Sequence, residues 1–403
     1  MKRPAGVITH PMGFSASGVA CGIKTGKEAP DVALLAADQP VTAAAVFTTN
    51  KVCAAPVLVS REHMKTSRGR IRAVVANSGN ANACTGKQGM TDARSMAALT
   101  AELIGVKPHE VLVASTGLIG RPLPMDKMDA GIRRAVEKLS SDYRGGAGFL
   151  RGIMTTDRFP KESERSIQVA GKEFRLSGVV KGAAMIAPDM ATMLSFVTTD
   201  AALGRAQLQK LLAGAVGRSF NRITVDGHMS TNDTCVALAS GRSGVTVTPG
   251  GRLEKKFAAA LEDVLLELAL LIVRDGEGAV RTAELRVSGA RSAADAELAA
   301  RAVAGSTLVR TALFGGDPNW GRIVSMAGAC GCAFTEAKTS LKINGLPIYR
   351  NGRPLPVTKE IEKTMTADHV VFDLSLGVGR ASSVVYTCDL GHSYVKLNAE
   401  YTT

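Results

Sequence analysis

Near the middle of the 403-residue chain stands the segment Lys181-Gly182-Ala183-Ala184-Met185-Ile186-Ala187-Pro188-Asp189-Met190-Ala191-Thr192-Met193-Leu194. In it a small residue, Ala191, directly precedes a hydroxyl residue, Thr192. If the Thr192 hydroxyl attacks the Ala191 carbonyl, the peptide bond becomes an ester, and water then frees a new N-terminal threonine. Such a residue combines a nucleophile with an α-amine base whose reference pKa is about 7.7–8. Because Ala-Thr pairs are common, the segment taken alone also suits a buried strand or a turn.

Other short blocks, rich in glycine, threonine and asparagine, are spread along the chain. They are Asn77–Gly86 (NSGNANACTG), Ser115–Gly120 (STGLIG), Met154–Asp157 (MTTD), Ser230–Thr234 (STNDT), Asp275–Ala279 (DGEGA), Gly316–Arg322 (GDPNWGR) and Asn398–Thr403 (NAEYTT). Each block is weak evidence by itself. Together with the segment 181–194 they resemble the bifunctional ornithine acetyltransferase/glutamate N-acetyltransferase family of arginine biosynthesis. The blocks follow the order of that family and run to the last residue.

The resemblance implies an enzyme that cleaves itself between Ala191 and Thr192. It would then transfer the acetyl group of N2-acetyl-L-ornithine to L-glutamate through an acyl ester on Thr192. Two half-reactions through one covalent intermediate predict ping-pong kinetics. By the family pattern, Thr116 and Gly117 form the oxyanion hole. The residues that the pattern implies as substrate contacts are Thr155, Lys181, Thr192, Glu277, Asn398 and Thr403.

Each of these residues also has a plainer structural interpretation. Ser-Thr-Gly after a strand is by itself a turn, and a single lysine usually lies at the surface. Glu277, in a Gly-Glu-Gly turn, suits a solvated position, and Thr155 suits a loop. A chain end is ordinarily disordered. The alternation in Tyr394-Val395-Lys396-Leu397 nevertheless predicts a strand that holds Asn398 and Thr403 in place.

The sequence departs from the family pattern at His228-Met229, where the family usually has Asp-Thr. Because of this change, neither the detailed structure of this loop nor the substrate preference of the enzyme can be taken from the family pattern. A histidine near a candidate site suggests a base, but a threonine with its own α-amine needs no imidazole. We therefore assign no role to His228, and a structural role to Asp317, Asn319 and Arg322.

Composition excludes several classes of protein. Hydrophobic residues make up 45% of the chain, enough to bury a core, and 42 glycines suit a loop-rich α/β protein. Seven scattered cysteines do not form a secreted disulfide scaffold. Because Cys330-Gly331-Cys332 lacks partners at zinc spacing, we expect no metal. The resemblance implies no cofactor either, and acetyl-CoA only as a second co-substrate. Lacking an apolar signal core or membrane span, the chain is expected to be cytoplasmic.

The net charge of +13 raises the question of nucleic-acid binding. Aromatic residues make up only 4% of the chain, with a single tryptophan, so platforms for stacking bases are hard to build. No nucleic-acid-binding motif is present. A positive surface also attracts small substrates that carry carboxylates, which is the interpretation we prefer.

Short β-branched runs alternate with amphipathic stretches, a pattern typical of α/β proteins. The predicted strands are 71–76, 110–114, 222–225, 285–288, 370–374 and 383–388. The predicted helices are 91–104, 125–139, 203–216, 253–274 and 293–304. We expect the helix 253–274 to stop at the turn Asp275-Gly276-Glu277-Gly278.

The resemblance implies a layered α/β/β/α sandwich of the self-processing type. We place it in a main domain, residues 1–285, followed by a smaller α/β domain, residues 286–403. Cleavage would give chains 1–191 and 192–403, and would nick one folded body rather than separate two domains. The family assembles the two chains as a heterotetramer in which each is present twice.

Three alternatives remain open from the sequence. Within the family, some enzymes also use acetyl-CoA as the acetyl donor to glutamate, and no residue separates the two versions. A related self-processing amidase or aminopeptidase would pass the acyl group to water instead. A basic binding protein without enzymatic activity would stay intact and bind nucleic acid in a salt-sensitive way.

Overall fold

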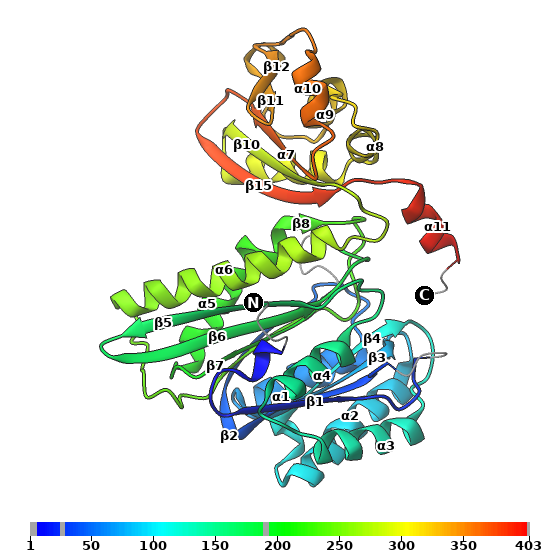
Figure 1. Ribbon diagram of the computed structural model, residues 1–403, viewed down its shortest axis with the longest axis vertical. Coiled ribbons are helices and arrows are strands. Elements are labelled where there is room, and N and C mark those ends of the chain that lie inside the picture. Colours follow the sequence, from blue (N-terminus) through cyan, green and yellow to red (C-terminus); the bar gives the residue numbers. More distant parts are fainter. Residues whose placement is uncertain (1–5, 25–28, 188–192, 401–403) are drawn as a thin grey trace.

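The computed structural model describes residues 6–24, 29–187 and 193–400. Figure 1 shows a large unit built from the first two thirds of the chain and a smaller unit above it. Within these residues the chain forms two mixed β-sheets, one of eight strands and one of seven. The fold is therefore mixed α/β, as the alternating pattern predicts.

The eight-stranded sheet has the order β4-β3-β2-β9-β7-β6-β5, and β1 pairs with β2. Its strands are β1 (Phe14–Val19), β2 (Val32–Phe47), β3 (Arg70–Asn80), β4 (Val111–Leu118), β5 (Lys161–Val169), β6 (Lys172–Lys181), β7 (Leu194–Thr199) and β9 (Thr234–Ala239). The long strand β2 joins two halves of this sheet. Its first part pairs with β1 and β3, its last part pairs with β9, and the register with β3 shifts between Ala36 and Val41.

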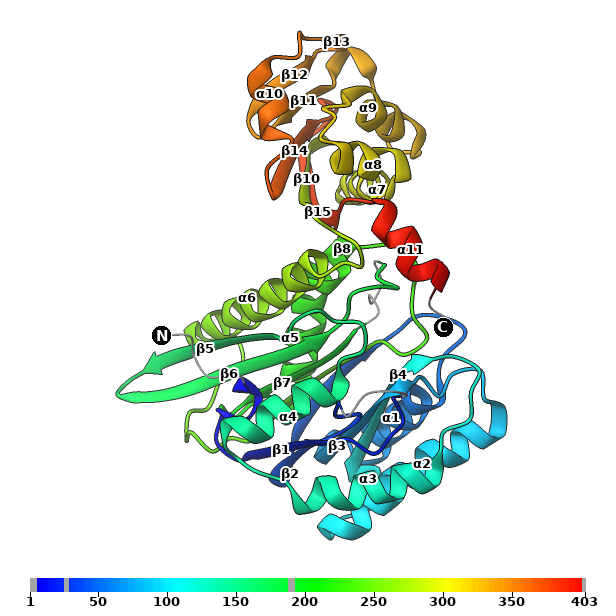
Figure 2. The ribbon, with the colours of Figure 1, turned by 45° about the vertical axis from the view of Figure 1, so that its right-hand side comes forward.

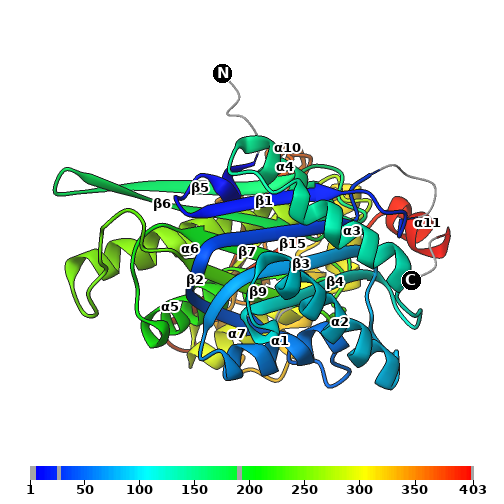
Figure 3. The same cartoon turned by 90° about the horizontal axis from the view of Figure 1, so that it is seen from below.

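Helices cover both outer faces of the folded sheet. They are α1 (Ala55–Thr66), α2 (Gly86–Ile104), α3 (Met125–Glu137), α5 (Arg205–Arg218) and α6 (Arg252–Arg274). Helix α4 (Tyr143–Ile153) instead contributes to the core between the two halves of the sheet. One apolar core joins α5 and α6 to the half of the sheet that contains β6, β7 and β9. Another joins α1, α2 and α3 to the half that contains β2, β3 and β4, which Figure 3 shows from below.

A third core lies between the two halves of the sheet. Val74 and Leu112 of one half pack there with Phe196 and Val236 of the other, and α4 contributes Phe149. The layers thus follow the order helices, sheet, sheet, helices, where the two sheet layers are the two halves of the eight-stranded sheet. This order confirms the predicted α/β/β/α sandwich. In central strands such as β3, alternate residues face alternate cores, because successive side chains point to opposite faces of a sheet.

The smaller unit is a seven-stranded sheet with helices and its own core. Its strands are β10 (Thr282–Ala290), β11 (Ser340–Ile343), β12 (Leu346–Arg350), β13 (Arg353–Pro354), β14 (His369–Ser375), β15 (Ala381–Cys388) and β8 (Ile223–Thr224). Its helices are α7 (Ala293–Gly305), α8 (Thr307–Gly315), α9 (Trp320–Ala329) and α10 (Lys359–Thr364). Strand β8 belongs to the large unit by sequence and pairs with β15, so it links the two. The proposed domain boundary at 285/286 falls inside β10 and stays a prediction.

The remaining elements are short. They are the 3-10 turns η1 (Val7–Thr9), η2 (Pro108–Glu110), η3 (Phe220–Arg222) and η4 (Glu336–Lys338), and the last helix, α11 (His392–Glu400). In Figures 1 and 2, α11 lies between the smaller unit and the β4 end of the large one. No helix within the described residues is long and apolar enough to cross a membrane.

The predicted helices and strands are present with shifted ends, apart from one correction. The predicted strand at 394–397 is wrong, because those residues lie in α11. Four residues are too few to separate a period of 2 from one of 3.6. In the block Asn77–Gly86, β3 continues to Asn80 and α2 begins at Gly86.

Candidate active site

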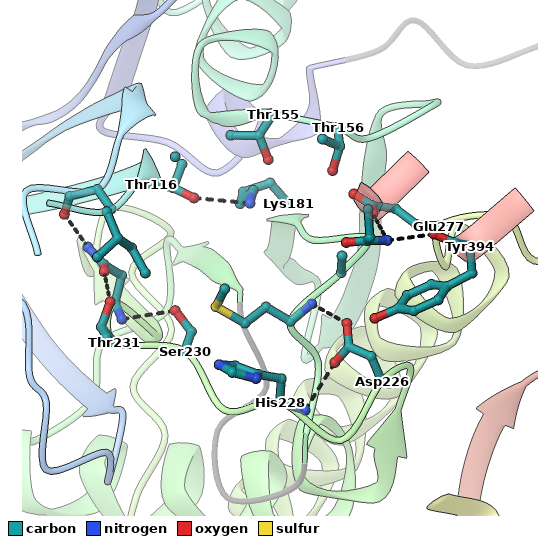
Figure 4. A pocket seen from close by; sticks show the side chains of 17 residues that line it. Thr116, Thr155, Thr156, Lys181, Asp226, His228, Ser230, Thr231, Glu277 and Tyr394 are labelled. Carbon is teal, nitrogen blue, oxygen red and sulfur yellow. Dashed lines mark hydrogen bonds between the residues drawn. The ribbon is translucent and has the colours of Figure 1, made fainter. Parts of the chain in front are cut away.

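One cavity of about 260 Å³ brings together all the predicted site residues that the structure describes. Figure 4 shows several of them as sticks. Those lining the cavity are Thr116, Gly117, Thr155, Lys181, Glu277 and Asn398. They come from β4, the loop after α4, the end of β6, the turn after α6, and α11. Segments far apart in the sequence therefore converge on one place, although the role of each residue stays a prediction.

The predicted cleavage pair Ala191-Thr192 and the terminal Thr403 lie outside the described residues. The chain directly after Thr192 is held firmly. The Met193 backbone N–H donates to Asp233 Oδ1 (3.0 Å), and its carbonyl accepts from the Thr234 N–H (3.1 Å). Leu194 then begins β7, opposite Lys181 on β6. The second predicted chain thus begins one residue before an anchored segment beside the cavity.

Thr116 and Gly117 lie near the end of β4, which runs parallel to β3. Gly117 has a φ of 131°, and a Cβ there would come within 2.3 Å of the Gly79 carbonyl carbon. Glycine is therefore required for β4 to approach β3 so closely. On Thr116, Oγ1 accepts a hydrogen bond from Lys181 Nζ (3.1 Å). Because the hydroxyl is the acceptor in that bond, its own hydrogen is free to be donated elsewhere.

Lys181 is buried, with 4% of its surface exposed, so the expectation of a surface lysine does not apply to it. Burial lowers the pKa of Lys181, since it disfavours the charged ammonium, and Lys161 adds to this effect. The carboxylates of Asp157, Asp233 and Glu277 oppose it. A buried ammonium beside a cavity is suited to hold a carboxylate as a point charge.

Glu277 and Asn398 form the opposite side of the cavity. The Glu277 backbone N–H donates to the Ala183 carbonyl (2.9 Å), which ties its turn to the segment after β6. Asn398 Nδ2 donates both to Glu277 Oε2 and to the Tyr394 carbonyl, each at 3.0 Å. A cation, Lys181, and an anion, Glu277, thus face one small cavity, as a zwitterionic ligand requires.

Sequence reasoning assigned no role to several polar residues that line the cavity. Asp226 accepts hydrogen bonds from the backbone of Met185 (2.5 Å), Ile186 (2.9 Å) and His228 (3.0 Å). Burial raises the pKa of Asp226, although these hydrogen bonds oppose the rise. Asn232 Nδ2 donates to the carbonyls of Ala81 (2.6 Å) and Ser115 (2.9 Å). Asn232 stands in the block Ser230–Thr234 and Asp226 lies two residues before His228, so closeness in sequence to these residues was the available clue.

His228 itself lines the cavity and is exposed. The departure His228-Met229 from the family pattern therefore falls at the site and not at a distant surface. Among the described residues, no group of histidine, cysteine, aspartate and glutamate side chains is arranged to hold a metal ion.

Comparisons with known proteins match the whole chain. The model of the ArgJ family matches residues 15–403. The arginine biosynthesis bifunctional protein ArgJ of Symbiobacterium thermophilum is 47% identical over 406 residues, covering 100% of both chains. The protein of the same name from Geobacter sulfurreducens is 48% identical, over 97% of this chain and 99% of its own.

A solved structure is also similar to this chain, over half of its length. A crystal structure of arginine biosynthesis bifunctional protein ArgJ from Bacillus halodurans is 37% identical, with a TM-score of 0.50, over 51% of this chain and 98% of its own. An ornithine acetyltransferase from Mycobacterium tuberculosis, in complex with ornithine, is 37% identical over 48% of this chain and 97% of its own, with a TM-score of 0.41. The chain therefore belongs to the ArgJ family of bifunctional arginine-biosynthesis enzymes.

Proposed function

We propose that this enzyme cleaves itself between Ala191 and Thr192 and then moves an acetyl group from N2-acetyl-L-ornithine to L-glutamate through an ester on Thr192. In the first half-reaction the Thr192 hydroxyl attacks the acetyl carbonyl, and the α-amine of Thr192 takes the hydroxyl proton. The amine then returns this proton to the departing nitrogen, so ornithine leaves as the C–N bond breaks. In the second half-reaction the amine of glutamate attacks the ester, and N-acetylglutamate leaves as Thr192 recovers its proton.

The oxyanion of each tetrahedral intermediate would lie against Thr116 and Gly117. The Thr116 hydroxyl already accepts from Lys181, so its hydrogen is available to the oxyanion together with the Gly117 N–H. Loss of one such donor typically reduces kcat by about 10²–10³-fold. Lys181 would hold the substrate carboxylate, and Glu277 a substrate ammonium. Thr155, Asn398 and Thr403 would supply further hydrogen bonds.

The observation that carries the proposal is the convergence on one cavity. Residues predicted from separate short blocks, from Thr116 to Asn398, line the same space. The strand that starts two residues after Thr192 pairs with the strand that ends in Lys181. After cleavage, the Thr192 amine would therefore be the start of a chain that is anchored next to Lys181, the residue predicted to bind the substrate carboxylate.

The length of a solved relative supports the cleavage. The chain of the Bacillus halodurans ArgJ structure is matched over 98% of its own length, yet it covers only 51% of this chain. That share is close to the share of either predicted product, 1–191 or 192–403. Two copies of each product as a heterotetramer, and a cytoplasmic location, belong to the same proposal.

A second acetyl donor is favoured by the word bifunctional in the names of the relatives. We propose acetyl-CoA for that role, as a co-substrate that acylates the same Thr192. Glutamate would then be acetylated without ornithine being released. An amidase or aminopeptidase would instead release acetate from acetylornithine with no need for glutamate.

The first test is the mass and N-terminal sequence of the purified protein beside the variant Thr192→Ala. We expect two fragments in the wild type, one beginning at Thr192, and one uncut chain in the variant. Acetyl transfer is then measured with glutamate, without it, and with acetyl-CoA in place of acetylornithine. A wild-type chain that stays whole would overturn the mechanism at its first step. Equal turnover with and without glutamate would indicate the hydrolase.

A further inference from the structure

A buried group of charges lies behind the cavity wall, outside the predicted site. Lys161, the first residue of β5, donates from Nζ to Asp157 Oδ1 (2.6 Å) and to Asp275 Oδ2 (2.5 Å). All three side chains are 0% exposed. No step of the proposed reaction uses them. We call Asp157, Lys161 and Asp275 the buried triad.

Asp157 connects the triad to two parts of the cavity wall. Its Oδ2 accepts from the Thr155 backbone N–H (2.9 Å), and its Oδ1 accepts from the Gly182 N–H (2.7 Å). Thr155 lines the cavity, and Gly182 directly follows Lys181, which also lines it. One carboxylate therefore fixes the backbone at or beside two predicted substrate contacts.

Asp275 connects the triad to a third part of the wall. It is the C-cap residue of α6 and precedes Glu277 by two positions. Its carboxylate accepts from the backbone N–H (3.0 Å) and from Nε (2.9 Å) of Arg158. The loop that carries Thr155 and the turn that carries Glu277 are thus joined through Lys161 and Arg158.

From these contacts we propose that Lys161 is a positioning residue, which holds Thr155, Lys181 and Glu277 at the spacing that the substrate requires. The proposal rests on the proposed function, because it concerns the same cavity. Lys161 touches no substrate. It acts through Asp157 on one side and Asp275 on the other.

The charges explain why an ammonium is needed at this point. Burial by itself would raise the pKa of Asp157, but Lys161, Lys181 and hydrogen bonds, among them the one from Gly182, hold it at about 2. Asp275 faces Arg158 and Lys161. Without Lys161, Lys181 is the remaining cation that acts on Asp157. It would then be drawn toward that carboxylate and away from Thr116.

Stability alone is a weak reason for such an arrangement. A buried ion pair seldom stabilises a protein more than apolar side chains of the same volume, because both charges lose their hydration. The triad instead fixes the relative positions of the segments that form the cavity wall, since charge-assisted hydrogen bonds are short and geometrically specific. Misplacing a substrate contact by about 1 Å can reduce the rate by about 10²-fold.

The test compares Lys161→Met with Arg165→Met. Arg165 lies on the same strand and bonds to Glu267 of α6 (3.0 Å), but both of those side chains are exposed. The control thus removes a surface ion pair between the same two elements. Ornithine binding is measured by calorimetry, and kcat, KM and their pH dependence are measured with acetylornithine.

For Lys161→Met we expect kcat/KM to fall by roughly 10²-fold, mainly through KM, with a parallel loss of ornithine affinity. The acid limb of its kcat/KM profile should move to higher pH, because Asp157 has lost its main cation and protonates more easily. For Arg165→Met we expect values within about twofold of the wild type, as for exposed ion pairs in general.

The double variant Lys161→Met/Asp275→Asn distinguishes the effect of losing the link between the wall segments from the effect of changing the net charge. It removes one positive and one negative group, so the net charge of the cluster equals that of the wild type. It should fold even if the single variant does not, and its pH profile should return toward the wild type. KM should stay raised by at least about tenfold, because the link between the two wall segments is gone.

Wild-type ornithine affinity and KM in the double variant would overturn the proposal, as would a single variant that loses thermal stability but keeps its KM and pH profile. If the wild type itself transfers no acetyl group, the proposed function fails. The positioning role of Lys161 is then tested separately, by comparing the ornithine affinity of the variants with that of the wild type in calorimetry.

Discussion

At the scale of single residues, Gly117 shows how closely the site depends on backbone geometry. Its φ of 131° and the 2.3 Å approach of a would-be Cβ to Gly79 leave no room for a side chain. The predicted oxyanion donor is the N–H of this same residue. Its position follows from the contact between β3 and β4.

Gly117→Ala should therefore destabilise the fold and remove activity together. We expect a loss of at least about 2 kcal/mol in the free energy of unfolding, from strain and from the clash with β3. The control is Gly120→Ala, three residues on, where φ is 78° but no atom lies within 4 Å of the added Cβ. Urea unfolding and acetyl-transfer assays on both variants check this. Equal effects would mean that backbone strain alone matters and that the approach to β3 does not.

Asp157 predicts a pH dependence of stability. Its pKa is about 2 in the folded protein against a reference of 3.8, so its ionised form stabilises the fold. That contribution, about 2 kcal/mol, is fully present above pH 3.8 and is lost as the pH falls toward 2. Urea unfolding of the wild type and of Asp157→Asn, from about pH 5 to about pH 3, should show the difference shrinking with acid. A difference independent of pH would show that Asp157 contributes only as a neutral hydrogen-bonding group.

At the scale of elements, α11 is unusual because none of its residues is buried. Its contacts with the rest of the protein include the hydrogen bond from Asn398 to Glu277, an edge-to-face contact between Phe314 and His392, and close packing of Tyr394 on Gly278. Tyr394 and Asn398 are four positions apart, so a helix puts both on the face that lines the cavity. This helix therefore closes the site but adds little to the core.

Asn398→Ala should raise KM without lowering the melting temperature. Losing one hydrogen bond to a charged group reduces substrate affinity by about tenfold. Lys396→Ala, on the same helix but outside the cavity lining, is the control and should match the wild type. A drop in melting temperature for Asn398→Ala would contradict the view that α11 serves binding and not folding.

The same argument applies to affinity tags. We expect a tag placed after α11 to reduce activity more than an N-terminal one, because this helix lines the cavity. Acetyl-transfer rates of the two tagged proteins, compared at equal melting temperature, test this. Equal activity would count against a role for the last residues.

At the scale of the whole molecule, the cleavage site lies within one folded body. Strand β7 belongs to the second predicted chain and pairs with β6 of the first, while β2 of the first chain pairs with β9 of the second. Two of the apolar cores also mix residues from both sides of position 192. Self-processing should therefore leave the architecture intact.

The two products should accordingly remain together after cleavage. We expect a single peak in gel filtration under native conditions, and two bands under denaturing conditions. Separation should require enough urea to unfold the sheet, because the shared strands and cores belong to one cooperative unit. Fragments that part in native buffer would mean that the strand pairs across the cleavage site are weak. The native elution volume also tests the proposed heterotetramer.

Much of this protein can be predicted from the sequence by itself. Local patterns predict most helices and strands, because periodicity and turn residues are properties of neighbouring positions. The ordered short blocks indicate the family, and through it the candidates Thr116, Lys181 and Glu277. The residues around position 192 also suit a buried strand or a turn, and the full set of blocks favours the self-processing interpretation.

Only the tertiary structure shows how these residues are held. The four residues 394–397 alternate like a strand but lie in α11, where the side chain of the next residue, Asn398, donates a hydrogen bond to Glu277. A lysine in a sequence carries no sign of burial, so neither the buried Lys181 nor the triad around Lys161 was predictable. Asp157 and Asp275 are separated by more than a hundred positions, and they meet because α6 ends where β5 begins. Contacts of that range depend on how the layers pack, which no local pattern records.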